Sequence, residues 1–318
     1  MSTVILSTAA LTIISHVLTT QLSVFADTQL RNLQITTAAY HFLTTFVVLL
    51  IASKPISSDL YSPLFTARRL PLPVVAPICT LFTLFLILNN LSLTLNPTSF
   101  FQLAKILTVP SVILFNYLFF HKSVSRYKLG VVAVACVGVG LASGAGVRSN
   151  PLGTIVAILA FTSTALYQIW IGRMLDRKVE GVEIGAPVLL MNQTGVSMCV
   201  LVCLVPFLDT MPNFGMFAWK MPQYRFPIRQ TNILAATVPW SSIVAMILAG
   251  FAAALINLSQ FLIIGSTSVL TFNIIGITKT VLILIMGWYV EGKVLGLLDV
   301  VGVTMAISGS FMYAQAKN

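Results

Sequence analysis

The segment LTFNIIGITKTVLILIMGWYV, residues 270–290, is apolar along most of its length but carries Lys279 near its middle. About 20 apolar residues at ~1.5 Å per residue cover the ~30 Å hydrocarbon core of a bilayer, so this segment has the length of a membrane-spanning helix. A lysine at the centre of such a helix costs roughly 2.5–3.5 kcal/mol on insertion scales, and it normally faces a polar cavity or a partner. Lys279 is therefore the first candidate for a residue that meets an anionic substrate.

Composition indicates that the whole chain is a membrane protein. Of its 318 residues, 57% are hydrophobic and 8% are charged, whereas an ordinary soluble domain has about 25% charged residues. Long apolar runs recur from end to end, which leaves no room for a sizeable soluble domain. The net charge of +10 lies in short connections, where topology and contact with the membrane surface explain it better than nucleic-acid binding.

Apolar runs separated by charged or turn-rich breaks predict an all-α polytopic membrane protein with ten transmembrane helices. The expected spans are 3–24, 33–53, 72–95, 98–120, 126–144, 152–172, 186–208, 238–259, 267–290 and 295–315. The first run has neither a basic leader nor a convincing cleavage site, so a retained helix is expected rather than a signal peptide. Lys and Arg are more numerous in the loops on the side of the termini, which predicts that both termini are cytosolic.

The chain also repeats itself, which predicts two five-helix halves, 1–148 and 149–318, within one transmembrane domain. In each half an Asn-Leu-Ser triplet (90–92 and 257–259) precedes a helix that bears a lysine. An apolar run, a short polar break and a helix of small residues follow in both halves. Because five is an odd number, the halves must be inverted relative to each other, as in many secondary transporters.

Three residues are candidates for binding phosphate groups. Lys279 and Thr280 combine an ammonium with a hydroxyl donor, and Lys105 is the counterpart of Lys279 in the first half. A lysine ammonium is a compact donor that suits phosphate oxygens. The inverted repeat predicts that the two lysines approach one central cavity from opposite faces, with Pro110 positioned to kink the helix of Lys105. The alternative for Lys105 is a side chain that snorkels to the membrane interface.

Five polar residues are candidates for contacting the base or sugar of a substrate: Asn192, Gln193, Asn273, Tyr167 and Gln168. Adjacent amides in a helix point about 100° apart, so one of the pair at 192 and 193 is expected to face the cavity and the other to bond a neighbouring helix. An amide offers both a donor and an acceptor, which suits the edge of a nucleobase.

The remaining polar and small residues are interpreted as structural. Asn90 and Asn257 are expected to join helices, and Asp299 to mark a helix end. The four cysteines lie in apolar runs and are expected to pack as small apolar residues. The small residues of GVGLASGAG and AISGS are expected to form helix-packing faces. The sequence has no GxxxxGK[ST] loop, no metal-ligand cluster and no catalytic triad or carboxylate pair, so neither an enzyme nor a metal or other cofactor is expected.

Three segments resemble a known family. They are NPTSFFQLAKILTVPSVILFNYLFF (96–120), GITKTVLILIMGWYVEG (276–292) and LLDVVGVTMAISGSFMY (297–313). Together with the ten-span plan, they are similar to the nucleotide-sugar and triose-phosphate translocator family of the drug/metabolite transporter superfamily. The Lys-Thr pair at 279–280 looks like the nucleotide-sugar branch, which includes UDP-xylose and UDP-galactose carriers, whereas plastid phosphate translocators carry Lys-Arg there.

The resemblance implies exchange of a cytosolic UDP-sugar, of the UDP-xylose or UDP-galactose type, for a lumenal nucleoside monophosphate by alternating access. It also implies a location in the Golgi or ER membrane. LLMNQ (189–193) and GITKT (276–280) stand where GDP-mannose carriers have FYNN and GALNK, so a guanine substrate is less favoured. Thr20 and Gln21 stand where relatives often have an Asn-Lys pair, which weakens any transfer of first-helix contacts.

Other readings of the sequence remain. The alternatives are a carrier of phosphorylated C3 compounds, a GDP-sugar transporter and a non-transporting membrane scaffold. The expected partners are a nucleotide sugar, a nucleoside monophosphate and the lipid bilayer, but no nucleic acid. The sequence leaves open the choice between a monomer and a homodimer, and it assigns no role to the 209–238 loop.

Overall fold

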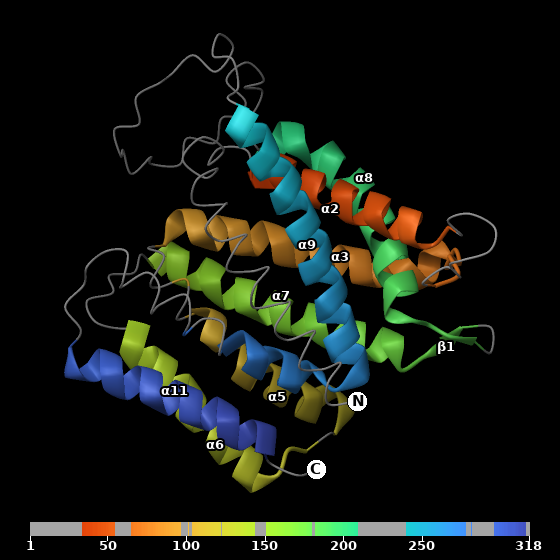
Figure 1. Cartoon of the computed structure of the whole chain (residues 1–318). Helices are drawn as coiled ribbons and strands as arrows, with labels where there is room; N and C mark the ends of the chain where they lie inside the picture. Colours follow the sequence, from red (N-terminus) through yellow and green to blue (C-terminus); the bar gives the residue numbers. More distant parts are fainter. Residues whose placement is uncertain are drawn as a thin grey trace.

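The described part of the chain is almost entirely helical (Figure 1). The computed structural model describes residues 34–54, 65–96, 101, 104–121, 123–143, 151–179, 182–208, 240–277, 281 and 296–315. Its helices are α2 (Gln34–Ala52), α3 (Leu72–Leu95), α5 (Thr108–Phe120), α6 (Arg126–Ser143), α7 (Pro151–Leu175), α8 (Ala186–Leu208), α9 (Trp240–Ser266) and α11 (Leu297–Gln315). Residues 269–277 form a further helical segment.

Five of the described helices, α2, α3, α7, α8 and α9, are long and apolar enough to cross a membrane. Two shorter apolar helices lie at Ala104–Phe120 and Leu297–Tyr313. Apolar side chains surround these helices instead of forming a single stripe, as is typical of membrane spans. The chain is a multi-pass membrane protein, whereas ten spans in two inverted halves stay a prediction.

Most observed helix ends lie close to the expected ones, with one clear correction. α3 and α8 have the predicted bounds, but α9 continues to Ser266 instead of ending at 259. The hydroxyl of Ser259 donates to the carbonyl of Ile256 within the helix at 2.8 Å, so a single polar residue does not end an apolar helix. The break comes instead at 267–268. The expected span 3–24, and residues 278–290 apart from position 281, lie outside the described residues.

The expected span from 98 to 120 is interrupted at Leu107, and α5 begins directly after it. The Leu107 N–H donates to the carbonyl of Ala104 at 3.1 Å, which is a tighter turn than that of an α-helix. Pro110 has no N–H to donate to the carbonyl of Ile106. The helix is thus interrupted within one turn of Lys105, whereas a kink at Pro110 stays a prediction.

A minimal β-hairpin is the exception to the all-α prediction within the described residues. β1 (Lys178–Val179) and β2 (Val182–Glu183) pair antiparallel and connect α7 to α8. With two residues in each strand, the hairpin shortens a connection and contributes no layer to the fold.

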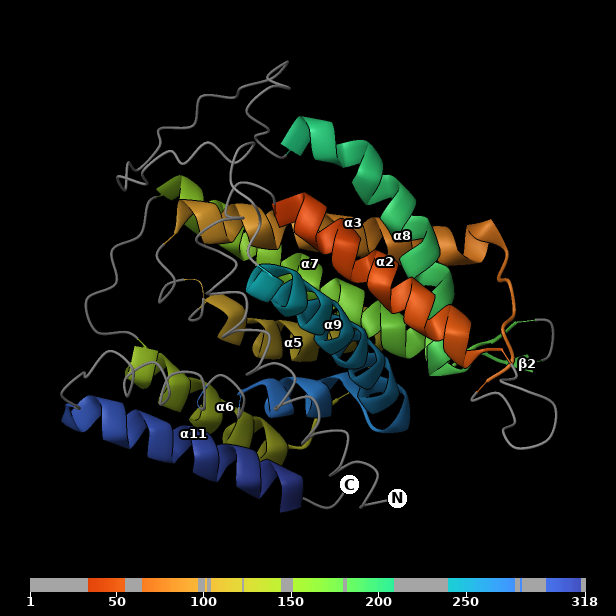
Figure 2. The same cartoon turned by 45° about the horizontal axis from the view of Figure 1, so that its top comes forward.

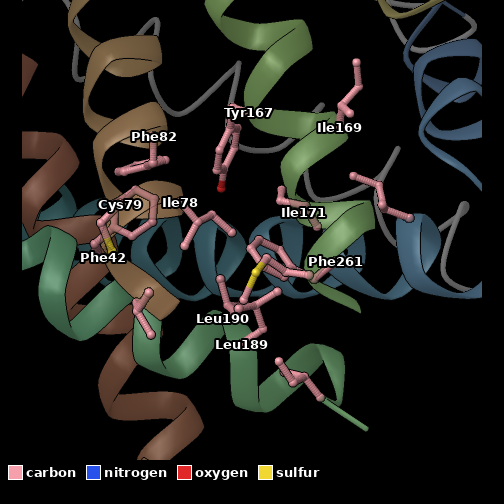
Figure 3. Packing of buried hydrophobic residues seen from close by; sticks show 14 of the residues in the cluster. Phe42, Ile78, Cys79, Phe82, Tyr167, Ile169, Ile171, Leu189, Leu190 and Phe261 are labelled. Carbon is pink, nitrogen blue, oxygen red and sulfur yellow. The ribbon is translucent and has the colours of Figure 1, made fainter. Parts of the chain in front are cut away.

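Two hydrophobic clusters hold the helices together. The large cluster is built mainly from α2, α3, α7, α8 and α9, and Figure 3 shows Phe82, Tyr167, Leu190 and Phe261 within it. The small cluster joins residues in or near α5, α6, α11 and the 269–277 segment: Ile106, Val109, Val132, Ala135, Leu270, Ile274, Ile277, Val281 and Ala306. Each cluster takes helices from both sides of residue 148, so the chain packs as one interleaved unit.

Small residues bring α6 and α11 into close antiparallel contact (Figures 1 and 2). A Cβ atom added at Gly138 would lie 2.5 Å from the backbone nitrogen of Ala306, and one at Gly309 would lie 2.8 Å from the backbone nitrogen of Ala135. Numbers rise along α6 as they fall along α11, which makes the pair antiparallel. The predicted small-residue packing faces are thus confirmed, because only residues without bulk allow this approach.

α3 and α7 run antiparallel along the interior, and their contact is called here the α3–α7 seam. One face of α3 carries residues at spacings of three and four: Phe82, Phe85, Asn89, Ser92 and Asn96. The Phe85 ring stacks on Tyr167, with centroids 5.3 Å apart. At the other end, the Asn96 amide donates to the carbonyl of Gly153 at 2.9 Å. A Cβ atom at 153 would overlap Asn96 Oδ1, so any larger residue there would force the Asn96 side chain to shift.

Candidate functional site

Lys105 lies beside a hollow at the Asn96 end of the α3–α7 seam. The hollow has about 160 Å³ of empty space, part of which is open to the surroundings, and is lined by Asn89, Ser92, Phe101, Ala104, Lys105, Ala157, Ala160 and Phe161. The Lys105 ammonium lies 5.0 Å from the centroid of the Phe101 ring, a cation–π distance. Within the described residues, no carboxylate pairs with this ammonium. A cation placed beside a hollow without a counter-ion is suited to binding an anion.

The local backbone explains why the lysine side chain stays accessible. Ala104 and Ile106, on either side of Lys105, are buried. Lys105 itself is exposed, because the two buried neighbours turn its side chain away from the packed face. The interruption at Leu107 ends this short helical piece directly after Ile106. The ammonium is thus carried by a backbone that is anchored on both sides.

The hollow, as the described residues outline it, is smaller than a typical ligand pocket. Small-molecule sites usually enclose roughly 300–1,000 Å³, whereas this hollow has room for about one water molecule. A nucleotide would need more room than these walls provide.

Asn89 is a polar residue of this hollow that the sequence alone did not single out. Its Nδ2 donates to Thr164 Oγ1 at 3.0 Å and to the carbonyl of Phe85 at 2.8 Å. The signal that could have found Asn89 is the spacing on α3, where it follows Phe82 and Phe85 on the same face and precedes Ser92 by three residues. Neighbouring Asn90 drew attention instead, because it belongs to the repeated triplet.

Tyr167 and Gln193 are brought together by the packing of α7 on α8. Gln193 Nε2 donates to the Tyr167 hydroxyl oxygen at 2.8 Å, and both side chains are buried. Figure 3 shows the Tyr167 ring extending from α7 into the large cluster, next to Phe82. Gln193 Oε1 is buried without a hydrogen-bond partner in the described part of the chain. Such an unsatisfied acceptor costs about 1–3 kcal/mol, which a ligand donor would relieve.

Gln168 and Asn273 form a second pair, on the side of α7 that faces the 269–277 segment. Asn273 Nδ2 donates to Gln168 Oε1 at 2.6 Å and to the carbonyl of Val269 at 2.9 Å. Since Asn273 precedes Lys279 by six residues, the pair ties α7 to the stretch that leads to that lysine. Their contact with substrate stays a prediction.

Asn192 is used by the protein itself. Its Oδ1 accepts a hydrogen bond from the Leu70 N–H at 3.0 Å, and its Nδ2 donates to the carbonyl of Arg68 at 2.8 Å and to that of Val188 at 2.8 Å. The side chain therefore fastens the segment before α3 to α8. Of the adjacent amides at 192 and 193, Gln193 is the one with an open acceptor.

Asn192→Ala is expected to lower the free energy of unfolding by about 1–3 kcal/mol, because the Leu70 N–H loses its partner. Thermal unfolding of the purified protein in detergent measures the change. The matched control is Asn90→Ala, which removes a half-buried amide for which the described residues show no hydrogen bond. Equal losses of stability in both variants would contradict the anchoring role.

Other predicted roles have mixed outcomes. The Asn257 amide donates to Thr45 Oγ1 at 3.2 Å, which confirms that it joins α9 to α2. The Asp299 carboxylate accepts from the Gly296 N–H at 3.0 Å, as expected of a residue at a helix start. All four cysteines are free. Lys279 and Thr280 lie outside the described residues, so their approach to Lys105 stays a prediction.

Comparisons with known proteins identify several relatives of this chain. No protein-family model matches the chain. It is 27% identical to UDP-rhamnose/UDP-galactose transporter 2 of Arabidopsis thaliana over 281 residues, which cover 88% of this chain and 73% of that protein. It is 26% identical to UDP-xylose transporter 3 of the same plant over 280 residues, covering 88% and 71%. "Nucleotide-sugar uncharacterized transporter 1" of that plant is 29% identical over 265 residues, covering 83% and 59%.

A chain of known crystal structure has a similar fold. The TM-score is 0.67, and the match covers 97% of this chain and 98% of that chain. The sequences are 12% identical, so this likeness concerns the fold alone. The relatives found by sequence are named as transporters and not as enzymes, which agrees with the expectation for this chain.

Proposed function

We propose that the chain is a member of the nucleotide-sugar transporter family of the drug/metabolite transporter superfamily, and that it exchanges a cytosolic UDP-sugar for a lumenal nucleoside monophosphate by alternating access. The carrying observation is the Lys105 ammonium beside a hollow between α3 and α7, without a carboxylate partner in the described part of the chain. The relatives named as UDP-xylose and UDP-rhamnose/UDP-galactose transporters support a UDP-sugar of one of these types.

Lys105, Lys279 and Thr280 bind the substrate phosphates in this proposal. Each ammonium offers charge-assisted hydrogen bonds to phosphate oxygens, and the Thr280 hydroxyl adds a donor. The support from the structure concerns Lys105: the hollow beside it is the place where a phosphate would meet the ammonium. The sequence repeat supplies Lys279 as the second half of the clamp.

The base is read at the other end of the α3–α7 seam. Gln193 has a buried acceptor, Oε1, without a partner among the described residues, next to the Tyr167 hydroxyl. A base edge with an N–H donor would satisfy it, and the aromatic rings of Phe85 and Tyr167 would offer flat surfaces for the base. Asn273, Gln168 and Asn192 complete the proposed lining, with Asn192 acting through its hold on the chain before α3.

Helix contacts support two inverted halves of five helices, 1–148 and 149–318. In this scheme α2 corresponds to α8, α3 to α9 and α6 to α11. α2 packs on α9, and α8 packs on α3. These two contacts are equivalent, because the correspondence replaces α2 with α8 and α9 with α3. Exchanging the two halves leaves the α2–α8 pair and the α6–α11 pair unchanged, and the helices of both pairs are in contact.

Strict exchange follows from the charge of the empty site. Closing a water-free site around unpaired lysines leaves their charge uncompensated, which costs several kcal/mol per ion. Liposomes loaded with UMP are therefore expected to take up labelled UDP-xylose or UDP-galactose at least about ten times faster than empty ones. A tenfold difference corresponds to 1.4 kcal/mol, well below that cost. Equal uptake into both kinds of vesicle would rule out obligatory exchange.

The proposed location is the Golgi or ER membrane, with both termini in the cytosol. The excess of Lys and Arg in the loops on the side of the termini supports the cytosolic termini, and the family resemblance supports the Golgi or ER. A tag at either terminus should react with antibody after selective permeabilisation of the plasma membrane alone.

A further inference from the structure

Asn89 has a fixed orientation within the α3–α7 seam. Its Nδ2 lies 2.8 Å from the carbonyl oxygen of Phe85, 3.5 Å from that of Ala160 and 3.0 Å from Thr164 Oγ1. Carbonyl oxygens only accept hydrogen bonds, so the amide nitrogen and not the amide oxygen must point to this side. The Thr164 hydroxyl donates its hydrogen to the Ala160 carbonyl at 2.7 Å, which leaves its oxygen to accept from Asn89.

The amide oxygen of Asn89 is left as an open acceptor. No hydrogen bond to Asn89 Oδ1 occurs within the described residues, and the half-buried side chain lines the hollow together with Lys105. Because three contacts hold the nitrogen, rotation of the amide cannot turn a donor toward the hollow without breaking them. Asn89 therefore presents an acceptor and no donor beside the ammonium.

Along the α3–α7 seam, Asn89 lies between the two ends of the proposed substrate site. On α3 it is one turn from Phe85, which stacks on Tyr167, and about one turn from Ser92 in the hollow. On α7 its partner Thr164 lies one turn from Tyr167 and one turn from Ala160, which lines the hollow. The distance along α7 from Tyr167 to Ala160 is ~10 Å at helical rise.

We propose that Asn89 Oδ1 accepts a hydrogen bond from a ribose hydroxyl of the bound nucleotide, which makes Asn89 a specificity residue for ribonucleotides. The inference rests on the proposed function, with the base at Tyr167 and Gln193 and the phosphates at Lys105. Base, ribose and phosphate follow one another in a nucleotide in the same order as these sites along the seam. A lone acceptor repels phosphate oxygens, whereas it matches the hydroxyl hydrogens of a ribose.

The test is a binding cycle on the purified full chain in detergent, measured by calorimetry with UMP, 2′-deoxy-UMP and 3′-deoxy-UMP. The wild-type protein is expected to bind one of the deoxy ligands about tenfold more weakly than UMP. Asn89→Ala is expected to bind UMP about tenfold more weakly than the wild type and to lose this discrimination. Asn90→Ala, the adjacent amide, serves as the control and is expected to keep it. A merely structural role of Asn89 would weaken all three ligands equally.

The possible outcomes separate the role of Asn89 from the proposed function. Absence of any uridine-nucleotide binding by the wild type would overturn the proposed function and the inference with it. UMP binding with equal affinity for all three ligands would overturn the inference alone, and this needs no variant. If Asn89→Ala does not fold, Asn89→Ser replaces it, because the shorter side chain cannot reach the same hydroxyl. Discrimination that persists in the folded variant would likewise overturn the role of Asn89.

Discussion

Lys105→Ala is expected to weaken the binding of UMP and of UDP-sugars by about 10- to 100-fold while the protein still folds. A hydrogen bond to a charged group contributes about 1.5–3 kcal/mol, and every 1.4 kcal/mol is tenfold in affinity. Within the described residues the ammonium contacts the Phe101 ring and no carboxylate, so its removal leaves no buried charge without a partner. Calorimetric titration and a thermal-shift assay, run on the same sample, measure affinity and folding.

The matched control is Lys128→Ala, because the Lys128 ammonium also lies over an aromatic ring, 5.9 Å from that of Tyr313. Lys128 is on α6, away from the hollow, and this variant is expected to bind UMP as the wild type does. Lys105→Arg should retain part of the affinity, since it keeps the charge but changes the donor geometry. Wild-type affinity in a folded Lys105→Ala protein would remove Lys105 from the phosphate site.

Gly138→Ala is expected to lower the free energy of unfolding by about 1–3 kcal/mol or more, although it adds one methyl group. The new Cβ would lie 2.5 Å from the backbone nitrogen of Ala306 and 2.6 Å from the carbonyl oxygen of Gly302. These are backbone atoms that cannot rotate away, so α6 and α11 would have to move apart. Thermal unfolding in detergent measures the loss, as a Tm lowered by several degrees.

The same substitution two residues further on gives the control. A Cβ at Gly140 meets nothing within 4 Å. In a helix interior alanine is favoured over glycine by up to about 1 kcal/mol, so Gly140→Ala should leave the Tm unchanged or raise it. Similar Tm values for the two variants would show that α6 and α11 do not approach as closely as the structure indicates.

The described helices were readily predicted because a helix in a membrane depends on residues that are close together in the sequence. Polar and charged breaks bound the apolar runs at both ends, so α3 and α8 have the expected ends. The span expected to end at 259 continues to Ser266, where the polar residues 266–268 interrupt the apolar run. A kink was predicted at Pro110, since a missing N–H is a property of the residue itself, but the observed interruption lies three residues earlier, at Leu107.

The candidate site was harder to predict, because side-chain roles depend on neighbours that are distant in the chain. Asn192 and Gln193 are adjacent in sequence, yet the first bonds the backbone near Leu70 and the second bonds Tyr167. Asn89 was overlooked, because an asparagine on a helix face becomes informative only when α7 places Thr164 beside it.

For the segment 270–290, the sequence alone determined that a lysine lies within an apolar run of membrane-spanning length, because the length of the run and the cost of a buried charge are local quantities. Through the repeat, the sequence predicts Lys105 as its counterpart. Only the tertiary structure decided that Lys105 borders a hollow next to α3 and α7. It also decided that the Asn89 nitrogen bonds Thr164, which leaves the amide oxygen free to accept a hydrogen bond in the hollow. Which side chains meet across a seam depends on the rotation and register of packed helices, and these arise from contacts between residues far apart in the chain.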